Sequence, residues 1–352
     1  MSASLASPLA GVRVIEFEGI GPGPLAGRML ADLGAEVTVI SRLQQGAVAA
    51  QLGGGGENPM QRGKTVVQLD LKQESARQEA LALVAQADAL IEGNRPGVME
   101  RLGLGPADCA KVNARIVYGR ITGWGQSGPL AQAAGHDLNY VALTGLLAVS
   151  AHRGERPMVP PTVVGDASGA LGLAFGVVSA VLQARTSGQG CVIDAAIVDI
   201  AAMLGGLVHW IHNSGQLGHE RPSAFHDSPF YDVYPCADGG HITLGALEPQ
   251  FYDLLLKKLG LTDVSAAQQY ATQDWPALKA RMAKLFLSQP RQHWCDLLEG
   301  TDVCFAPVLT LREAALHPHN VARGTIARAP SGALSSAPAP RFSPLPGAPA
   351  HD

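Results

Sequence analysis

The sequence is poor in several features that define large classes of proteins. Aromatic residues make up only 5% of its 352 residues, and neither the 26 lysines and arginines nor the 30 aspartates and glutamates form a long run of one sign. A formal charge of -4 without a basic patch disfavours binding to nucleic acid or to an anionic membrane surface. We therefore expect a folded protein whose partners are not polyanions.

Cysteine is also scarce and shows no metal-binding spacing. The five cysteines are an odd number, lie far apart and contain no CxxC pair; they are Cys109, Cys191, Cys236, Cys295 and Cys304. This pattern is typical of reduced thiols and not of a disulfide framework or a zinc site. We expect no disulfide and no bound metal.

Long apolar runs and a secretion signal are missing as well. The longest apolar stretch, from Ala170 to Leu182, is interrupted by Gly172, Gly176 and Ser179 and is shorter than a membrane span requires. The N-terminus lacks a basic segment followed by an apolar one. Both absences predict a cytoplasmic protein without a membrane span.

The sequence is rich in small residues and in alternating strand and helix patterns. Alanine is the most frequent residue and glycine contributes 41 positions. Residues 11–17 read as a strand, LAGRMLADLGA follows with helical spacing, and EVTVISR returns as a strand. TVVQLDL, DALIEG and IVYGRITG repeat the strand pattern. The alternation predicts an α/β fold with a Rossmann-like, mostly parallel sheet covered by helices on both faces.

The pattern changes in the second half of the chain. The stretch from Ala167 to Arg185 and the segment CVIDAAIVDIAAMLGGLVHWIHNSG read as mostly helical, and FYDVYPC-ADGG-HITLGAL then reads as a β-hairpin. Helical segments follow, and the last 24 residues hold six prolines. We predict a large domain over 1–213, a smaller α+β domain over 225–320, and a return of 322–352 to the large domain.

Two familiar cofactor or catalytic motifs are absent. GIGPGP lies between a strand and a helix but lacks the GxGxxG spacing, and its prolines remove amide donors from the turn, which disfavours a nicotinamide dehydrogenase. No GxSxG occurs, which removes the usual serine hydrolase elbow.

Three polar residues remain in apolar or glycine-rich surroundings: His136 in GHD, Asp166 in VVGD and Glu248 in LGALEPQF. Each also has a purely structural interpretation. Asp166 suits a helix N-cap, Glu248 suits the cap of the helix near Pro249, and His136 can bond a backbone carbonyl.

Taken together, the motifs resemble those of the family III CoA-transferase (CaiB/BaiF) superfamily, and within it the α-methylacyl-CoA racemases of lipid metabolism. The matching stretches run through nearly the whole chain: PLAGVRVIEFEGIGPGPLAGRMLADLGAEV, LIEGNRPGVMERLGLGP, TGWGQSGPLAQAAGHDLNY, VVGDASG and YDVYPCADGGHITLGALEPQFY. Their order and spacing make the resemblance specific.

The resemblance implies a cofactor-independent isomerase that interconverts (2R)- and (2S)-2-methylacyl-CoA thioesters. It implies His136 and Asp166 as the two acid/base groups and Glu248 as the partner that orients His136. Inversion needs one group to remove the α-proton and another to return a proton to the opposite face. We expect amides at the N-terminus of the helix after Asp166 to stabilise the enolate.

The resemblance also points to residues that would contact the CoA part of the substrate. Its phosphates call for arginines, and its adenine and pantetheine arm for apolar and polar neighbours. These residues are Ile20, Arg42, Asn94, Arg95, Val98, Arg101, Asp137 and Tyr140. Asn94 stands where such racemases more often carry an aromatic residue.

Two alternatives stay open at this point. In a family III CoA-transferase, Asp166 would be a nucleophile that forms a covalent acyl intermediate. A non-catalytic CoA-binding protein of the same fold would have lost one of the three polar residues, and all three are present. The GHD motif and the absence of a glycine-rich loop after Glu248 favour the racemase.

The family resemblance finally implies an interlocked homodimer. In it, each active site would combine large-domain residues of one subunit with small-domain residues of the other, and Glu248 would reach His136 across the interface. The long linkers of the sequence, at 214–229 and after His317, suit such an arrangement.

Overall fold

The computed structural model of the chain describes residues 7–44, 51, 58–152, 154–217, 221–328 and 331–345. The chain divides into two compact units. Unit 1 comprises 1–147, 159–205 and 335–352, and unit 2 comprises 148–158 and 206–334. The division differs from the predicted domains in three places. The break after the sixth strand comes at Gly205 and not at 213, residues 148–158 belong to unit 2, and the return to unit 1 begins at Ser335 and not at 322.

Unit 1 is built on a six-stranded parallel sheet with the order β3-β2-β1-β4-β5-β6, which is the order of a doubly wound Rossmann fold. The predicted α/β fold class is confirmed. The strands are β1 (Arg13–Phe17), β2 (Glu36–Ser41), β3 (Lys64–Gln68), β4 (Ala89–Glu92), β5 (Val117–Thr122) and β6 (Cys191–Ala196).

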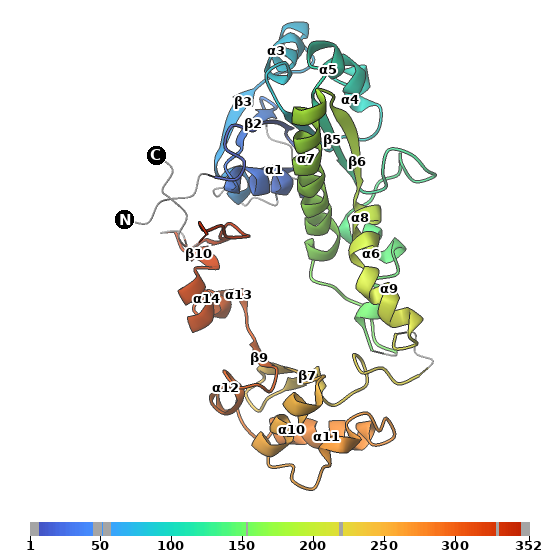
Figure 1. The fold of residues 1–352 in the computed structure, drawn as a ribbon, viewed down its shortest axis with the longest axis vertical. Coiled ribbons are helices and arrows are strands. Elements are labelled where there is room, and N and C mark those ends of the chain that lie inside the picture. The colour runs from blue at the N-terminus through green and yellow to red at the C-terminus, as the bar shows by residue number, and fades with distance from the viewer. Residues whose placement is uncertain are drawn as a thin grey trace. The chain divides into compact units, whose positions relative to one another are not determined.

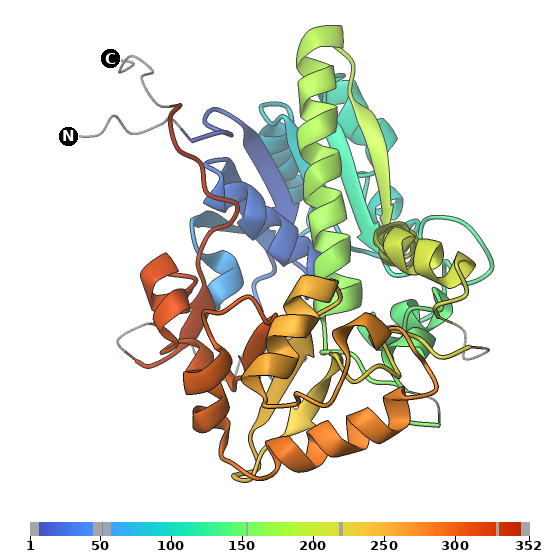
Figure 2. The same cartoon turned by 60° about the horizontal axis from the view of Figure 1, so that its bottom comes forward.

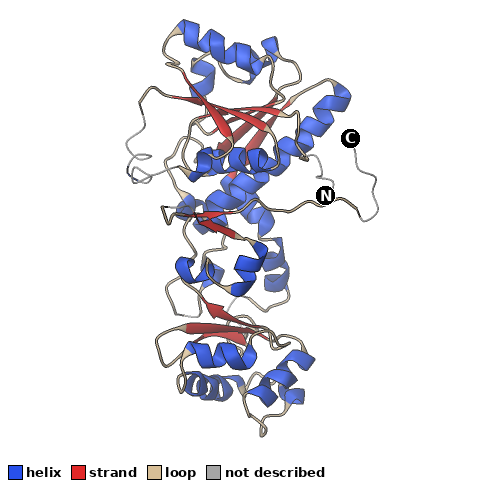
Figure 3. Cartoon of the chain, turned by 90° about the vertical axis from the view of Figure 1, so that its left-hand side faces the viewer, coloured by secondary structure: helices blue, strands red, loops and turns tan. Residues whose placement is uncertain are grey.

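Helices cover both faces of this sheet (Figures 1 and 3). On one face, α1 and α7 pack against each other and share a core with Val14, Ile91 and Val117. On the other face, α3, α4 and α5 bury Leu90 and Tyr118. The helices are α1 (Pro22–Asp32), α3 (Glu74–Val84), α4 (Val98–Arg101), α5 (Pro106–Val112), α6 (Asp137–Leu143), α7 (Ser168–Ser187) and α8 (Ile197–Leu204), with a 3-10 turn at Pro59–Gln61 and a π-helical turn at Val163–Ala167.

The strand β6 corrects the prediction of a mostly helical segment after residue 190. Cys191–Ala196 pairs in parallel register with β5, from Val117↔Cys191 to Thr122↔Ala196. Apart from Asp194, its residues are small or apolar and lead directly into the helix α8, so periodicity could not separate the short strand from the helix. Pairing with β5 decides the conformation, because an unpaired β5 edge would leave its backbone groups unsatisfied.

A buried ion pair ties three elements of unit 1 together. Lys64 Nζ lies 2.6 Å from Glu16 Oε2, with both side chains almost fully buried, and also donates to the Pro24 carbonyl at 2.8 Å. The pair thereby links β3 and β1 to the first turn of α1. It requires glycine at position 27, because a Cβ there would lie 1.8 Å from Glu16 Oε2.

The helix α7 coincides closely with the predicted helix, but together with the π-helical turn before it the apolar segment is longer than Ala170–Leu182. Val163–Ser187 is long and apolar enough to cross a membrane by length and composition, so the length argument made from Ala170–Leu182 does not hold. However, Gly169, Ala170, Leu173 and Val177 of this helix are buried in unit 1. Core helices of soluble proteins meet the same length criterion, and one face of α7 packs on β5 and β6 while the other is exposed (Figure 1).

The tail that follows Leu334 is held by two arginines of unit 1. Arg28 donates to the Ser336 carbonyl at 2.6 Å and Arg62 donates to it at 3.2 Å. Asp32 fixes Arg62 through two bonds of 2.9 Å. These contacts give the return of the chain to unit 1 its anchor.

Unit 2 contains the predicted hairpin. β7 (Tyr231–Pro235) and β8 (His241–Gly245) are antiparallel, and β9 (Phe305–Val308) adds to β8. Tyr234, Ile242 and Leu244 enter a core with the helices that follow β8, which are orange in Figure 2 beside the yellow strands. The remaining elements are α9 (Gly206–Asn213), α10 (Pro249–Lys258), α11 (Trp275–Phe286), α12 (Arg291–Leu298), α13 (Leu311–Ala314), α14 (Pro318–Arg323) and two 3-10 turns at Ala148–Ser150 and Ala266–Gln268. A two-stranded sheet of β10 (Ile326–Arg328) and β11 (Leu334–Ser336) lies where the chain passes from unit 2 to unit 1.

Candidate active site

A pocket of about 480 Å³ opens at the carboxyl ends of the first four strands of unit 1. In open α/β sheets, ligands bind at this edge, beside the point where the strand order reverses between β1 and β4. We name it pocket A. Its lining residues are Phe17, Glu18, Ile40, Ser41, Arg42, Leu43, Gln44, Leu69, Asp70, Leu71, Lys72, Asn94, Val98, Met99 and Leu102.

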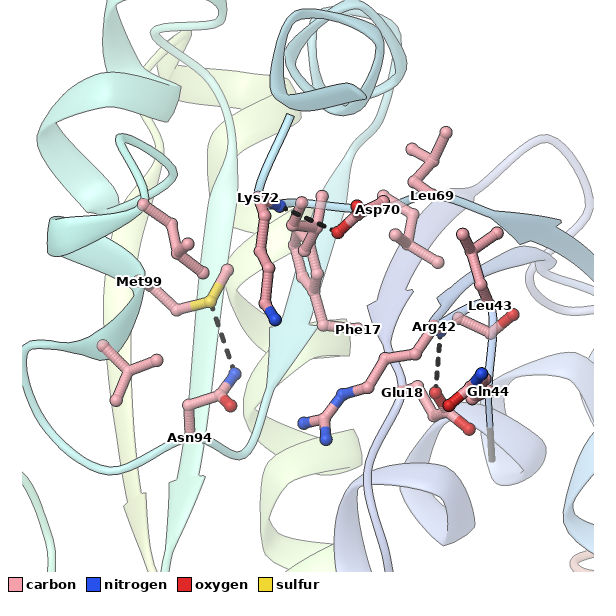
Figure 4. Close-up of a pocket in the computed structure, with 15 residues that line it drawn as sticks. Phe17, Glu18, Arg42, Leu43, Gln44, Leu69, Asp70, Lys72, Asn94 and Met99 are labelled. Carbon is pink, nitrogen blue, oxygen red and sulfur yellow. Dashed lines mark hydrogen bonds between the residues drawn. The ribbon is translucent and has the colours of Figure 1, made fainter. Parts of the chain in front are cut away.

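Pocket A combines two cations, Arg42 and Lys72, and two acids, Glu18 and Asp70, with an apolar wall. Figure 4 shows the side chains of Arg42 and Lys72 extending into the same space, between Asn94 and Met99 on one side and Glu18 on the other. The backbone amide of Arg42 donates to Glu18 at 2.9 Å, which holds the start of the loop after β2. Such a pocket suits a ligand that carries both phosphates and a flat apolar group.

The structure brings Arg42, Asn94 and Val98 of the predicted CoA contacts together in pocket A. Lys72 and Met99 line the same pocket and were not among the residues predicted from the sequence. A signal for Lys72 exists, because it stands directly after the strand motif TVVQLDL, where parallel strands present their ligand contacts.

A buried acid supports the loop that carries Asn94. Glu92, at the end of β4, accepts the Asn94 amide at 2.7 Å and Arg120 Nε at 2.8 Å. Arg120 also pairs with Glu100 on α4 at 2.7 Å. Burial raises the pKa of Glu92, whereas the Asn94 amide and Arg120 favour its charged form. The network fixes the loop after β4 to the neighbouring strand.

A second pocket of about 250 Å³, pocket B, contains three more of the predicted residues: Arg95, His136 and Tyr140. Its other lining residues are Gly93, Pro96, Thr122, Gly123, Trp124, Ala131, Ala133, Ala134 and Gly135. Asn94 of pocket A and Arg95 of pocket B are adjacent in the chain, so one loop contributes to both pockets. An elongated ligand could therefore contact the same loop along its length.

His136 and Tyr140 are held by the first turn of α6. The His136 backbone amide donates to Asn139 Oδ1 at 3.0 Å, and its carbonyl accepts the Asn139 amide at 2.8 Å. The Tyr140 hydroxyl donates to the Gly135 carbonyl, and its ring meets Trp124 edge to face at 4.8 Å. The His136 side chain is exposed at the pocket, where it can exchange protons with a ligand.

Asp166 lies in the π-helical turn before α7, with its carboxylate toward the start of α1. A Cβ built on Gly21 would be 3.2 Å from Asp166 Oδ2. Burial, and then the charge of Asp137, raise the pKa of Asp166 to about 6, while His136 acts in the opposite direction. The folded chain thus binds this proton more tightly than the unfolded chain, so this group's contribution to stability is lost as the pH rises from about 4 to about 6.

Three backbone amides around Asp166, just before α7, are already hydrogen bonded. Asp137 Oδ1 accepts the amides of Gly165 and Asp166, at 2.9 and 2.8 Å, and the amide of Ala167 donates to the Thr162 carbonyl at 2.9 Å. The sequence prediction assumed that α7 begins as a free N-terminus. Because a π-helical turn precedes α7, these three amides are not available to an enolate. A role for the amides of α7 itself, which begins at Ser168, stays a prediction.

Three predicted contact residues lie outside both pockets. Asp137 is buried and caps the Asp166 segment. The guanidinium of Arg101 folds back toward Gly97, where a Cβ would be 3.2 Å away, and Ile20 is exposed in the turn before α1. Glu248 belongs to unit 2, at the N-cap of α10. Its pairing with His136 stays a prediction.

The described residues contain no group of three or more histidine, cysteine or acidic side chains arranged to hold a metal ion. Within the same residues all five cysteines are free.

The fold and the pockets define a doubly wound α/β protein with one pocket lined by arginine and lysine as well as two acids, and a second pocket that carries a histidine. The family model described as CoA-transferase family III matches residues 9–351, and the chain belongs to this family.

Relatives and solved structures agree with this membership. The chain is 40% identical to α-methylacyl-CoA racemase of Mus musculus, over 97% of this chain and 88% of that protein, and 38% identical to that of Homo sapiens, over 94% and 86%. The structure of Rv3272 from M. tuberculosis superposes with a TM-score of 0.79 at 28% identity, covering 96% of this chain and 93% of that one. A CaiB/BaiF family protein from Brucella suis, at 24% identity, shares the fold with a TM-score of 0.81, covering 96% and 93%.

Proposed function

We propose that this chain is an isomerase that interconverts (2R)- and (2S)-2-methylacyl-CoA thioesters. The observation that carries the proposal is the placement of two proton-transferring groups in one region of unit 1. His136 caps α6, Asp166 precedes α7, and the two are close enough for His136 to lower the pKa of Asp166 against the effect of burial. The identity to two racemases over most of the chain supports this choice.

The chemistry needs a base on each face of the α-carbon. One base removes the proton to leave an enolate of the thioester, and the conjugate acid of the other returns a proton to the opposite face. A carboxyl group with a pKa near 6 exchanges protons readily near neutral pH, and a histidine does so as well. The reaction moves only protons, so the proposal includes no metal or redox cofactor.

The CoA part of the substrate would lie in pocket A, with Arg42 and Lys72 on its phosphates and Asn94 and Met99 beside the nucleotide. The pantetheine arm would follow the loop 93–97 to pocket B, where His136 lies. The proposal places the protein in the cytoplasm, without a membrane span.

The proposal includes a homodimer in which Glu248 of one subunit orients His136 of the other. One face of α7 supports association between copies. Leu171, Phe175, Val178 and Leu182 are spaced for one helix face and are 53%, 72%, 38% and 69% exposed.

The deciding experiment is incubation of one enantiomer of a 2-methylacyl-CoA in deuterated water. We expect the α-position to gain deuterium as the opposite enantiomer accumulates, both followed by NMR and chiral chromatography. If no deuterium enters the α-position, the proposal is wrong.

The same incubation with hydroxylamine separates the CoA-transferase alternative. A transferase that forms an acyl intermediate on Asp166 would be trapped as a hydroxamate and inactivated in the presence of acyl-CoA. We expect neither outcome from a racemase.

Pocket A gives a separate prediction about affinity. We expect Arg42→Ala and Lys72→Ala each to raise the Kd for CoA roughly tenfold, because a hydrogen bond to a charged group contributes about 1.5–3 kcal/mol. Isothermal titration calorimetry would measure this. The exposed Lys111→Ala is the matched control, and binding of a pantetheine thioester without the nucleotide should not change in any of the three variants. Equal loss for both ligands would contradict the assignment of pocket A to the nucleotide.

A further inference from the structure

Asp137, which follows His136 in the chain, is buried and is not a lining residue of pocket A or pocket B. It accepts three backbone amides: those of Gly165 at 2.9 Å and Asp166 at 2.8 Å on Oδ1, and that of Thr162 at 3.1 Å on Oδ2. The residue is 8% exposed. Every one of these amides belongs to the segment that carries Asp166.

This segment has a shape that is costly without Asp137. Thr162 has a φ of +64°, which is rare for a β-branched residue and needs compensating contacts. Gly165 is required for close approach, because a Cβ there would lie 2.5 Å from Asp137 Oδ1. The three hydrogen bonds supply the compensation, so the conformation of the turn depends on the Asp137 carboxylate.

Asp137 also adds a negative charge to the surroundings of Asp166. Within the described residues no cationic side chain pairs with Asp137. After burial, its charge is the larger cause of the raised pKa of Asp166, and His136 is the one group that acts against it. Tyr140, on the same face of α6, is neutral and has its own pKa raised by burial and then by Asp166 and Asp137. The other elements in contact with the turn, α1, α7 and α8, add no ionisable group to the surroundings of Asp166.

We propose that Asp137 is a positioning residue of the racemase, which fixes the Asp166 carboxylate relative to His136 and keeps it a competent base by its own negative charge. The inference rests on the proposed function. Its chemical logic is that the two directions of a racemisation are equivalent, so the two bases work best with similar proton affinities. An isolated carboxyl group is a much weaker base than imidazole, with ordinary pKa values of about 4 and 6.5. Burial and a neighbouring carboxylate reduce that difference.

The test is Asp137→Asn. The amide side chain keeps one oxygen for the Gly165 and Asp166 amides but removes the charge and turns an NH₂ group toward the Thr162 amide. We expect kcat for interconversion to fall roughly tenfold or more, since the base is weaker and less well held, while KM and the Kd for CoA change little. The acidic limb of the kcat profile should move about one pH unit lower, because Asp166 then loses its proton more easily.

Asp199→Asn is the matched control. It removes one exposed carboxylate from α8, which also packs near the turn, and Asp199 is absent from the groups that affect Asp166. We expect kcat and the pH profile of Asp199→Asn to equal those of the parent protein.

If Asp137→Asn folds poorly, Thr162→Gly in the same chain removes the strain of the positive φ and should recover folding. The double variant should not regain the parent's position of the acidic limb of the kcat–pH profile, because the negative charge of Asp137 is still missing. A restored limb in the double variant would overturn the electrostatic part of the proposal.

A ¹³C titration of aspartate carboxyl groups, with the Asp166 resonance assigned by its loss in Asp166→Asn, makes the test independent of activity. We expect the Asp166 midpoint to be lower in Asp137→Asn than in the parent. An unchanged midpoint overturns the proposal even if the protein racemises its substrate. If Asp137→Asn instead raises the Kd for CoA and leaves kcat and the Asp166 midpoint unchanged, the proposal is wrong and Asp137 is a CoA contact, as the sequence predicted. If the Asp166 midpoint is lower in Asp137→Asn but the parent protein shows no α-proton exchange, the interaction between Asp137 and Asp166 is upheld and the proposed function is refuted.

Discussion

His136→Ala and Asp166→Asn are each expected to abolish interconversion of the two enantiomers while one enantiomer still exchanges its α-proton with solvent. A two-base reaction stops when either base is missing, because the enolate cannot be protonated on the opposite face. We expect a loss of roughly 10²–10⁴-fold in interconversion, the usual contribution of a positioned acid/base group. The base that remains can still remove a proton from its own face and return a deuteron to it.

The two variants should therefore be complementary. The enantiomer that exchanges in His136→Ala is expected to be the one that does not exchange in Asp166→Asn. Deuterium incorporation into each pure enantiomer measures this, with chiral analysis to confirm that no inversion occurs. CoA affinity and the thermal unfolding midpoint serve as controls for folding. Loss of exchange from both enantiomers in one variant and from neither in the other would show a single base and contradict the assignment.

Lys64→Met is expected to be the most destabilising single change in unit 1 that touches neither pocket. It leaves the carboxylate of Glu16 buried without its partner and removes the bond to the Pro24 carbonyl. Breaking a buried ion pair by removing one partner costs about 3–5 kcal/mol. Urea unfolding followed by circular dichroism would measure this loss in the free energy of unfolding.

The double variant Glu16→Leu/Lys64→Met is the informative comparison, because it removes both charges. We expect it to recover most of the loss, since an apolar pair of similar volume is often no less stable than a buried ion pair. Asp108→Ala, which breaks the exposed pair with Lys111, is the surface control and should cost less than about 1 kcal/mol. A double variant as unstable as Lys64→Met would show that volume and not charge dominates at this site.

Two buried ion pairs of unit 1 support different segments of the chain. Glu16 and Lys64 hold the first turn of α1, whereas Glu92 and Arg120 hold the loop that carries Asn94. Glu92 ends β4, where the ligand-contacting loop with Asn94 begins, whereas Lys64 is the first residue of β3. The buried Glu92–Arg120 pair stiffens the Asn94 loop, and a stiff loop loses less conformational freedom when a ligand binds.

Much of the fold follows from local patterns in the sequence. The alternation of strand and helix segments indicates the parallel sheet. The spacing of apolar residues in each segment shows which side chains must be buried and hence whether the segment is a strand or a helix. The five strands before residue 123 and the hairpin in unit 2 were predictable for this reason. Motif order was sufficient to indicate the family and, with it, the importance of His136 and Asp166.

Tertiary structure decided what periodicity does not contain. Cys191–Ala196 is a strand because β5 offers it an edge, and the chain leaves unit 1 at Gly205 because the helical segment is interrupted there. Asp137 shows the same limit at the site. Its sequence position beside His136 indicated a CoA contact, but its carboxylate binds amides some 28 positions away in the chain.

The composition and motifs of this protein thus determined its fold class, its few plausible chemistries and the residue types that carry them. Only the tertiary structure decided which amides remain free, which carboxylate gains a high pKa and which acid supports which loop. The physical reason is that hydrogen bonding, burial and electrostatic interaction depend on distances between segments remote in sequence, and those distances exist only after the chain has folded.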